Sequence, residues 1–298
     1  MKKFLNSLAI TTALVLAQSC SSITKIDEKA ISVSTHQHEA ISRTENHHGE
    51  HSTSDTVHHD ENHKDKKVLT QANLKVPSHI SPNQTIPISI DVQDLNGKAI
   101  TNFETFQEKL MHLIVVSDDL QFFSHIHPAY KTNGQFEVAA SFPQAGGYTF
   151  FSDYKPTGKT EQVSVLKAQV LGNTIPAPEI DIQRSKTFND TQVNLALSEP
   201  TVKAGQEVTL MFKLQDAASN QPLTDLQPYL GENGHFVIVR NSKQLTAADY
   251  IHAHALKNTP AGQVDFMTSF PQRGKYKLWG QFNRNGKIIT ADFWLNVV

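Results

Sequence analysis

The chain has 298 residues, of which 38% are hydrophobic, enough to form two modest cores rather than one large one. Its formal net charge of −2 gives no basic surface for nucleic acid, so nucleic acid is not expected as a partner. Histidine is unusually abundant, since the sequence contains 15 histidines but only one cysteine.

Residues 1–20 have the pattern of an export signal. Lys2 and Lys3 precede an apolar stretch, Phe4 to Ala17, which is too short and too polar for a stable membrane span. Its end resembles the lipobox of bacterial lipoproteins, in which the chain is cut before a cysteine that becomes acylated. Ala17 stands where that motif has leucine, so ordinary cleavage or an uncleaved anchor remain alternatives. We predict lipidation at Cys20 and a lipoprotein of the bacterial cell envelope, held on the membrane by this anchor and facing the periplasm or the exterior.

Residues 21–67 are rich in Ser, Thr, Glu, Asp and Lys and show hardly any apolar periodicity, so we predict a disordered tether. Eight histidines lie in this stretch, at His36, His38, His47, His48, His51, His58, His59 and His63. Acidic residues such as Glu50 and Asp60 stand beside them and add oxygen ligands. A flexible tract of this composition can wrap a transition-metal ion, and a plain soluble spacer is the alternative.

From residue 68 onward the sequence changes to short alternating stretches separated by turn signals, and this pattern occurs twice. Residues 141–154 (SFPQAGGYTFFSDY) and 269–282 (SFPQRGKYKLWGQF) share Ser, Phe, Pro, Gln, Gly and Tyr at the same spacing. We therefore predict an all-β protein with two tandem Greek-key β-sandwiches, Ig-like or cupredoxin-like. The expected boundaries are 68–172 for the first sandwich, 173–189 for a linker containing Pro176 and Pro178, and 190–298 for the second sandwich.

Each copy is expected to contain six or seven strands. Residues 84–94 alternate apolar and polar side chains, and Pro87 within them favours an edge strand. Residues 112–116 (HLIVV) are almost continuously apolar, as in a strand buried on both faces. Residues 135–143 and 147–154 are expected to pair with each other, and reversals are expected at Asn96-Gly97, Asn133-Gly134 and Gly146-Gly147.

The strand HLIVV and the segment FSHIHP, residues 123–128, are expected to form an antiparallel hairpin. The register that sets Ile114 opposite His125 also sets His112 opposite His127. Because residues two apart on a strand share a face, this register brings three imidazoles to one side within chelating distance. A slip of one residue would turn His112 to the other face.

The second copy repeats this arrangement with GHFVIV and YIHAHAL. The equivalent register sets His235 opposite His254 and Val237 opposite His252. We predict one metal site per sandwich, the two acting independently, with a copper or zinc ion as cofactor. The alternative is that these histidines form structural hydrogen bonds. Met111 and Met267 favour copper as soft ligands, although methionine is more often core filler.

At these residues the chain resembles bacterial envelope proteins of the YtkA-like type, which carry M-H-L-x-V-V, F-x-H-x-H-P and Y-L-G-x-x-G-H motifs. The matching residues are Met111 to Val116, Phe123 to Pro128, and Tyr229 to His235. The second copy departs from the pattern, with Gly234 in place of the methionine and Ala255 in place of the proline. The resemblance, over about residues 68 to 298, implies the sandwich fold and the handling of copper or other heavy metals.

Catalysis has little support in the sequence. No G-x-S-x-G, H-E-x-x-H or phosphate-loop motif occurs, and Asp118 and Asp119 are expected to form a turn rather than a catalytic pair. The function that we predict is transition-metal capture at the cell envelope. An enzymatic function is less expected than metal binding. A surface interaction or adhesion module with structural histidines, binding an unidentified protein or glycan, is the alternative.

Overall fold

The computed structural model describes residues 69–298, which belong to one compact unit, residues 60–298. The predicted signal peptide, Cys20 and the eight tether histidines lie outside the described residues. The side chain of His254 also lies outside the described part, although its backbone is placed in a strand. Within the described residues, no helix is long and apolar enough to cross a membrane.

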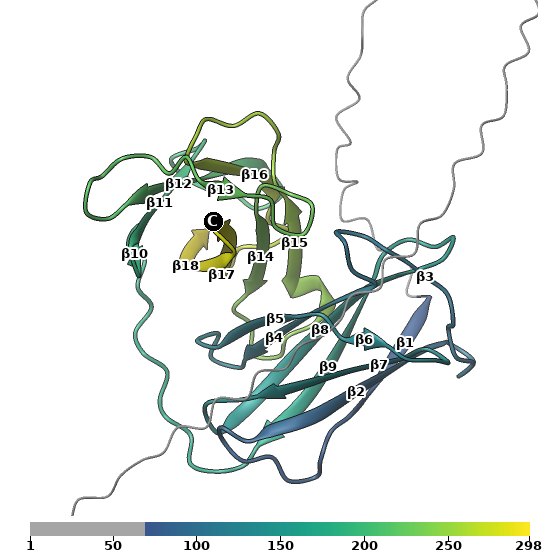
Figure 1. Cartoon of the computed structure of the whole chain (residues 1–298). Helices are drawn as coiled ribbons and strands as arrows, with labels where there is room; N and C mark the ends of the chain where they lie inside the picture. The colour runs from purple at the N-terminus through teal and green to yellow at the C-terminus, as the bar shows by residue number, and fades with distance from the viewer. Residues whose placement is uncertain (1–68) are drawn as a thin grey trace, which may run out of the picture. The chain divides into compact units, whose positions relative to one another are not determined.

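The first half of the described chain is a β-sandwich of two antiparallel sheets (Figure 1). One sheet has the order β1-β2-β7-β6, formed by β1 (Thr70–Lys75), β2 (Thr85–Asp94), β7 (Gln135–Ser141) and β6 (Ala129–Tyr130). The other has the order β3-β8-β4-β5, with β9 also paired to β8, formed by β3 (Phe103–Glu104), β8 (Gly146–Pro156), β4 (Met111–Ser117), β5 (Phe123–Ile126) and β9 (Gln162–Val170).

The second half repeats this topology. One sheet has the order β10-β11-β12-β16, formed by β10 (Ser185–Phe188), β11 (Thr191–Leu197), β12 (Glu207–Asp216) and β16 (Gln263–Ser269). The other has the order β13-β17-β14-β15, with β18 paired to β17, formed by β13 (Leu226–Gln227), β17 (Gly274–Arg284), β14 (His235–Arg240), β15 (Tyr250–His254) and β18 (Lys287–Val297). A short 3₁₀ turn, η1 (Ala247–Asp249), precedes β15. The predicted fold class, two tandem Ig-like sandwiches, is therefore confirmed.

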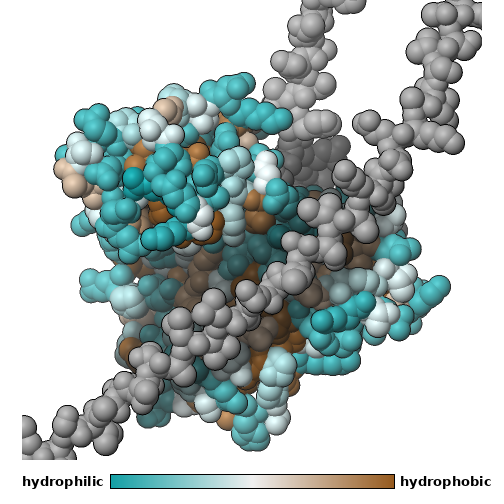
Figure 2. All heavy atoms as spheres, in the orientation of Figure 1, coloured by the Kyte–Doolittle hydropathy of each residue, from teal (hydrophilic) through white to brown (hydrophobic). Residues whose placement is uncertain are grey.

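Alternation of side chains explains the core of each sandwich. In β2, Ile86, Ile88 and Ile90 are buried, whereas Pro87 between them is exposed. Each sandwich has its own apolar core, and the aromatic side chains Phe142 and Tyr148 in the first correspond to Phe270 and Tyr276 in the second. Figure 2 shows that hydrophilic residues cover much of the visible face, while hydrophobic residues gather in the middle of this view.

Strand β4 is buried on both faces, as its continuous apolar run predicts. Leu113 and Val115 belong to the core of the first sandwich, whereas Ile114 and Val116 belong to a third apolar cluster. Strand β14 divides its side chains in the same way. The third cluster joins the two sandwiches and contains Ile114, Val116, Leu120, Phe151, Val237, Val239, Leu245, Tyr250, Trp279 and Trp294.

The contacts across this third cluster are reciprocal. Phe123 stacks on Trp279 with ring centroids 4.8 Å apart, and Tyr250 stacks on Phe151 at 4.9 Å. Phe123 and Tyr250 occupy the same position in the two repeats, as do Phe151 and Trp279. Each sandwich therefore offers the other the same surface, which is the pattern of an isologous interface within one chain.

Three details of the predicted strand pairing are wrong or need refinement. β7 and β8 lie in different sheets, because the chain crosses between the two layers of the sandwich after β7. The edge position predicted for residues 84–94 is wrong, because β2 lies between β1 and β7. Pro87 is tolerated there because it is beyond the last β1 partner, Ser89, so its missing N–H interrupts no bond with β1. The end of the expected linker forms β10, whose residues Ser185–Phe188 pair with β11.

Candidate metal centre

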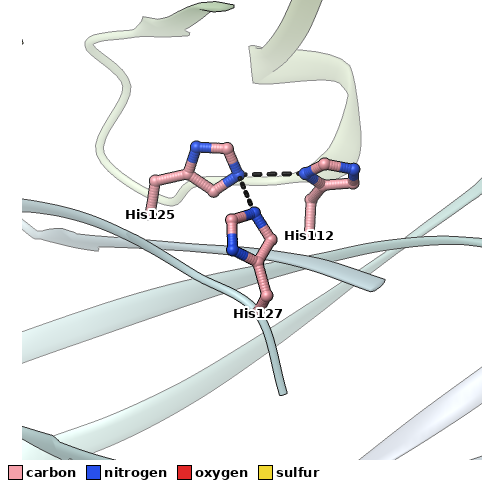
Figure 3. Close-up of side chains that lie close together, drawn as sticks. All are labelled: His112, His125 and His127. Carbon is pink, nitrogen blue, oxygen red and sulfur yellow. Dashed lines mark hydrogen bonds between the residues drawn. The ribbon is translucent and has the colours of Figure 1, made fainter. Parts of the chain in front are cut away.

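The hairpin of β4 and β5 brings together the three histidines predicted for the first sandwich. Ile114 lies opposite His125, which confirms the predicted register. One ring nitrogen from each of His112, His125 and His127 lies within 4.8 Å of the other two. Figure 3 shows the three rings pointing toward one another, with His125 in contact with both of the others. These three residues are called the histidine triad below.

The contacts within the triad join ring nitrogens directly. His125 Nε2 lies 3.0 Å from His112 Nδ1 and 3.1 Å from His127 Nε2 (Figure 3). His112 is fully buried, and the other two rings are partly buried at the end of the hairpin. The triad nitrogens therefore converge in a region that is largely closed to solvent.

Outer hydrogen bonds fix the tautomers of two triad members. His125 Nδ1 donates to Gln281 Oε1 at 2.7 Å, so its Nε2 carries the lone pair. His112 Nε2 lies 3.1 Å from the carbonyl oxygen of Phe106, which can only accept. A neutral His112 has one ring proton, yet both of its nitrogens face acceptors, since Nδ1 faces the lone pair of His125. Whichever nitrogen of His112 carries the proton, the other one directs its lone pair at an acceptor, either His125 Nε2 or the Phe106 carbonyl oxygen. A cation between the two facing acceptors would remove this repulsion.

Burial opposes protonation of these rings. Burial, and after it the nearby His252, lower the pKa of His112 to about 4. Burial and His112 likewise lower the pKa of His127 to about 4. The pKa values of His125 and His235 are well below their ordinary range, again because of burial first and neighbouring histidines second. A proton is therefore a poor candidate for the missing cation near neutral pH.

The second repeat supplies a matching pair of imidazoles. His235 lies opposite His254 and Val237 opposite His252, which confirms the second predicted register. His252 Nε2 lies 2.7 Å from His235 Nε2. His252 Nδ1 donates to Asp153 Oδ2 at 3.2 Å, and His235 Nε2 donates to Gln107 Oε1 at 3.1 Å. His235 and His252 are called the second pair below.

The triad and the second pair adjoin each other, so the two predicted sites are neighbours, and their independence stays a prediction. The ring centroids of His125 and His235 are 4.3 Å apart, and those of His112 and His235 are 5.5 Å apart. Since the histidine-bearing faces of β4 and β14 form the interface of the two sandwiches, the two ligand sets meet there. The geometry defines one composite cluster rather than two isolated ones.

The outer partners are exchanged between the sandwiches. His125 of the first sandwich donates to Gln281 of the second, and His252 of the second donates to Asp153 of the first. Asp153 and Gln281 occupy the same position of the repeated segment, as do His125 and His252. Each sandwich therefore orients a histidine of the other, in the way that outer partners orient the ligands of metal sites.

Asp153 places a buried carboxyl group in the cluster, where its Oδ2 accepts from His252 Nδ1 and from the Tyr250 hydroxyl. Asp153 is 2% exposed, and its Oδ1 has no hydrogen-bond partner. Among the described residues, its one ion-pair partner is His252, which carries charge only when protonated. A buried carboxylate in such surroundings is costly unless a cation lies nearby.

Sequence reasoning missed three polar residues of the cluster: Asp153, Gln281 and Gln107. The first two stand at one position of the repeat, which is the signal that could have revealed them. Gln107 comes from a tight turn in which Gln107 and Glu108 have positive φ angles of 45° and 64°. That turn serves both ligand sets, because the Phe106 carbonyl accepts from His112 while the Gln107 side chain accepts from His235.

The methionines do not join the cluster. Met111 is fully buried in the core of the first sandwich, because it points away from the face that carries His112. Met267 lies on β16, in the sheet of the second sandwich that does not contain His235. Asp119 accepts from Ser117 Oγ and from the Gln121 backbone, as the predicted turn requires.

The fold and the cluster define a class: two tandem Ig-like β-sandwiches whose facing sheets share buried histidines. The sequence matches a domain of unknown function, DUF8832, over residues 66–169 and again over 186–298, so the chain belongs to that family. No curated protein matches the sequence of this chain.

Solved structures with similar folds include a PKD domain of an M14-like peptidase from a Thermoplasmatales archaeon, with 14% identity over 34% of this chain and 92% of that chain and a TM-score of 0.23. Invasin, a bacterial integrin-binding protein, is 13% identical over 75% of this chain and 39% of its own, with a TM-score of 0.23. A tetra-tandem repeat of a large adhesion protein is 10% identical over 77% of this chain and 49% of its own, with a TM-score of 0.26.

Proposed function

We propose that this protein binds a transition-metal ion at the histidine triad. The observation that carries the proposal is the position of His112, whose single proton cannot satisfy both the Phe106 carbonyl and the lone pair of His125. A metal ion among His112 Nδ1, His125 Nε2 and His127 Nε2 replaces this repulsion by three coordinate bonds.

The outer contacts support the same reading. Ligating histidines commonly donate their other ring N–H to a carbonyl or carboxylate oxygen, and His112 and His125 both do so. The low pKa values of His112 and His127, about 4, leave these nitrogens unprotonated and ready to coordinate near neutral pH. The buried charge of Asp153 would be compensated by a cation in the adjoining cluster.

The donor set favours zinc or copper. Three imidazoles with an open fourth position suit Zn(II) or Cu(II), whereas hard ions such as Mg(II) and Ca(II) prefer oxygen ligands. No sulfur atom takes part among the described residues, since Met111 lies in the apolar core.

The wider role that we propose is metal capture by a lipoprotein of the bacterial cell envelope. The predicted signal sequence, Cys20 and the histidine-rich segment support that role from the sequence, as does the resemblance to YtkA-like proteins. In this role the tether collects ions at low affinity and the sandwich cluster holds them more tightly. A surface interaction module with structural histidines is the competing function.

Titration with Zn(II) tests the proposal. The parent protein is the full chain with the eight tether histidines replaced by serine, so that the tether contributes no binding. Zn(II) is expected to raise its melting temperature, and His125→Ala and the half-buried His127→Ala are each expected to reduce this rise. His79→Ala is the matched control, because His79 is exposed and lies outside the cluster. An unchanged melting temperature of the parent in Zn(II) and in Cu(II) would refute metal binding and favour structural histidines.

A further inference from the structure

Nitrogen contacts and ring contacts divide the composite cluster into two sets. Within the triad, nitrogens lie 3.0 and 3.1 Å apart, and within the second pair they lie 2.7 Å apart. Between the sets, the rings of His112 and His235 stack with planes that differ by 21°, whereas those of His125 and His235 are tilted by 38°. Among the described residues, the triad alone forms a group of three histidines whose nitrogens all lie within 4.8 Å of one another, so the second pair converges on a different point.

The second pair has its own outer partner and its own oxygen donor. Asp153 accepts from His252 Nδ1, which leaves the lone pair of that ring on Nε2. The Nε2 atom of His235 lies beside both His252 Nε2 and Gln107 Oε1. His235 is 1% exposed and its Nδ1 has no hydrogen-bond partner, so this atom can carry the ring proton when Nε2 coordinates.

We infer that the cluster binds a second transition-metal ion, held by His235 Nε2, His252 Nε2 and Gln107 Oε1, beside the ion of the triad. This inference rests on the proposed function, because it extends one metal site to a two-metal centre. Its ligands come from both sandwiches: the histidines from β14 and β15, and the amide oxygen from the turn before β4.

Local charge distinguishes the two positions. The carboxylate of Asp153 lies behind His252, so a divalent ion in the second position lies next to a buried negative charge. Lys109 lies near the triad and disfavours positive charge at His112 and His127. The position of the second pair is therefore expected to fill first with a divalent ion, and the triad second.

The repeat supplies a matched variant for the amide ligand. The turn Tyr229–Glu232 corresponds to the turn Phe106–Lys109, and Leu230 occupies the place of Gln107 with a positive φ of 54°. Gln107→Leu therefore installs the residue that the same turn already accepts in the second repeat. It removes the oxygen donor without demanding a new backbone conformation.

The experiment counts ions in the full chain with serine in place of the eight tether histidines. The protein is equilibrated with Cu(II), freed of unbound ion, and its copper content and electron paramagnetic resonance spectrum are measured. We expect two ions per chain with spin coupling between them. His252→Ala is expected to leave one ion without coupling, Gln107→Leu to weaken the binding of one ion by at least about 10-fold, and His79→Ala to leave both ions bound.

The outcomes separate the two proposals. A parent protein that binds no copper overturns the proposed function and this inference together. One ion per chain in the parent overturns the two-metal centre and leaves metal binding intact. Two ions without spin coupling also overturn the inference, because ions bound at the adjoining sets would lie within a few ångströms of each other.

Discussion

The two sandwiches present the same pair of histidine-bearing strands to each other. They differ in the residue that accepts the hydrogen bond from the Nδ1–H group of the other sandwich's histidine. In the first sandwich this residue is the carboxylate Asp153, and in the second it is the amide Gln281. Because the partners are exchanged, His252 is backed by a charge and His125 by a neutral group. The duplicated domain thus produces a cluster that is symmetric in geometry and asymmetric in charge.

Acid is expected to destabilise the metal-free protein more than any single substitution in the cluster. Folding lowers the pKa of His112 and His127 to about 4, whereas the unfolded chain has the ordinary value of about 6.5. Between these values the unfolded state binds protons that the folded state excludes, so the stability of the folded state decreases as the pH decreases. Each such histidine contributes about 1.4 kcal/mol per pH unit.

Urea unfolding of the metal-free protein between pH 7.5 and 4.5 measures this effect. Above pH 7 these histidines are neutral in both states, so they are expected to make the free energy of unfolding depend little on pH. Below about pH 6.5 the free energy of unfolding is expected to fall progressively. A free energy that stays constant down to pH 4.5 would show that the imidazoles are not buried together in solution.

The second largest effect is expected for Asp153→Asn, which keeps the shape and removes the charge. Zn(II) and Cu(II) affinity should fall by about 10- to 100-fold, since an outer carboxylate raises the basicity of its histidine. The metal-free protein should become more stable, because a buried carboxylate is lost. Isothermal titration and urea unfolding measure the two effects. Equal affinities for variant and parent would show that Asp153 does not contribute to metal binding.

The reverse substitution, Gln281→Glu, sharpens the comparison from the other side. It gives His125 the charged partner that His252 already has, so affinity for divalent ions is expected to rise by about 10-fold while metal-free stability falls. Gln281→Met is the control that removes the acceptor altogether, and it should lower the affinity. A rise in affinity with both variants would contradict a role for the outer hydrogen bond.

The smallest effect is expected at the reciprocal aromatic stacks. Phe123→Leu retains an apolar side chain but loses the stack on Trp279, which should lower the free energy of unfolding by about 1 kcal/mol. Metal affinity should fall only slightly, because the histidines keep their own hydrogen bonds. A complete loss of metal binding in this variant would mean that the apolar docking, rather than the outer partners, holds the histidines in place.

The elements of the fold followed from the sequence where the cause was local. Alternation in residues 84–94, the continuous apolar run of 112–116 and the duplicated H…H-x-H spacing predicted strands, double burial and the registers of both hairpins, and each is observed. The pairing of β7 with β8 was wrong because both are good strands with a short connection, and local pattern does not reveal that the chain changes sheets.

The composite nature of the cluster was not predictable from either repeat alone. The sequence shows which face of β4 carries His112, and the apolar residues on that face, Ile114 and Val116, predict burial without indicating what covers them. What covers them is the equivalent face of the other sandwich, and that contact brings Gln281 and Asp153 to the histidines. Such a long-range arrangement depends on docking between domains, for which the sequence carries no periodic signal.

Anomalous diffraction from crystals of the protein grown with Zn(II) tests the central claim most directly. A peak is predicted at the convergence of His112 Nδ1, His125 Nε2 and His127 Nε2, about 2.0–2.1 Å from each coordinating nitrogen. A map with no peak at the cluster, in crystals where His112 and His125 still make direct ring contact and zinc is bound elsewhere, would contradict the claim.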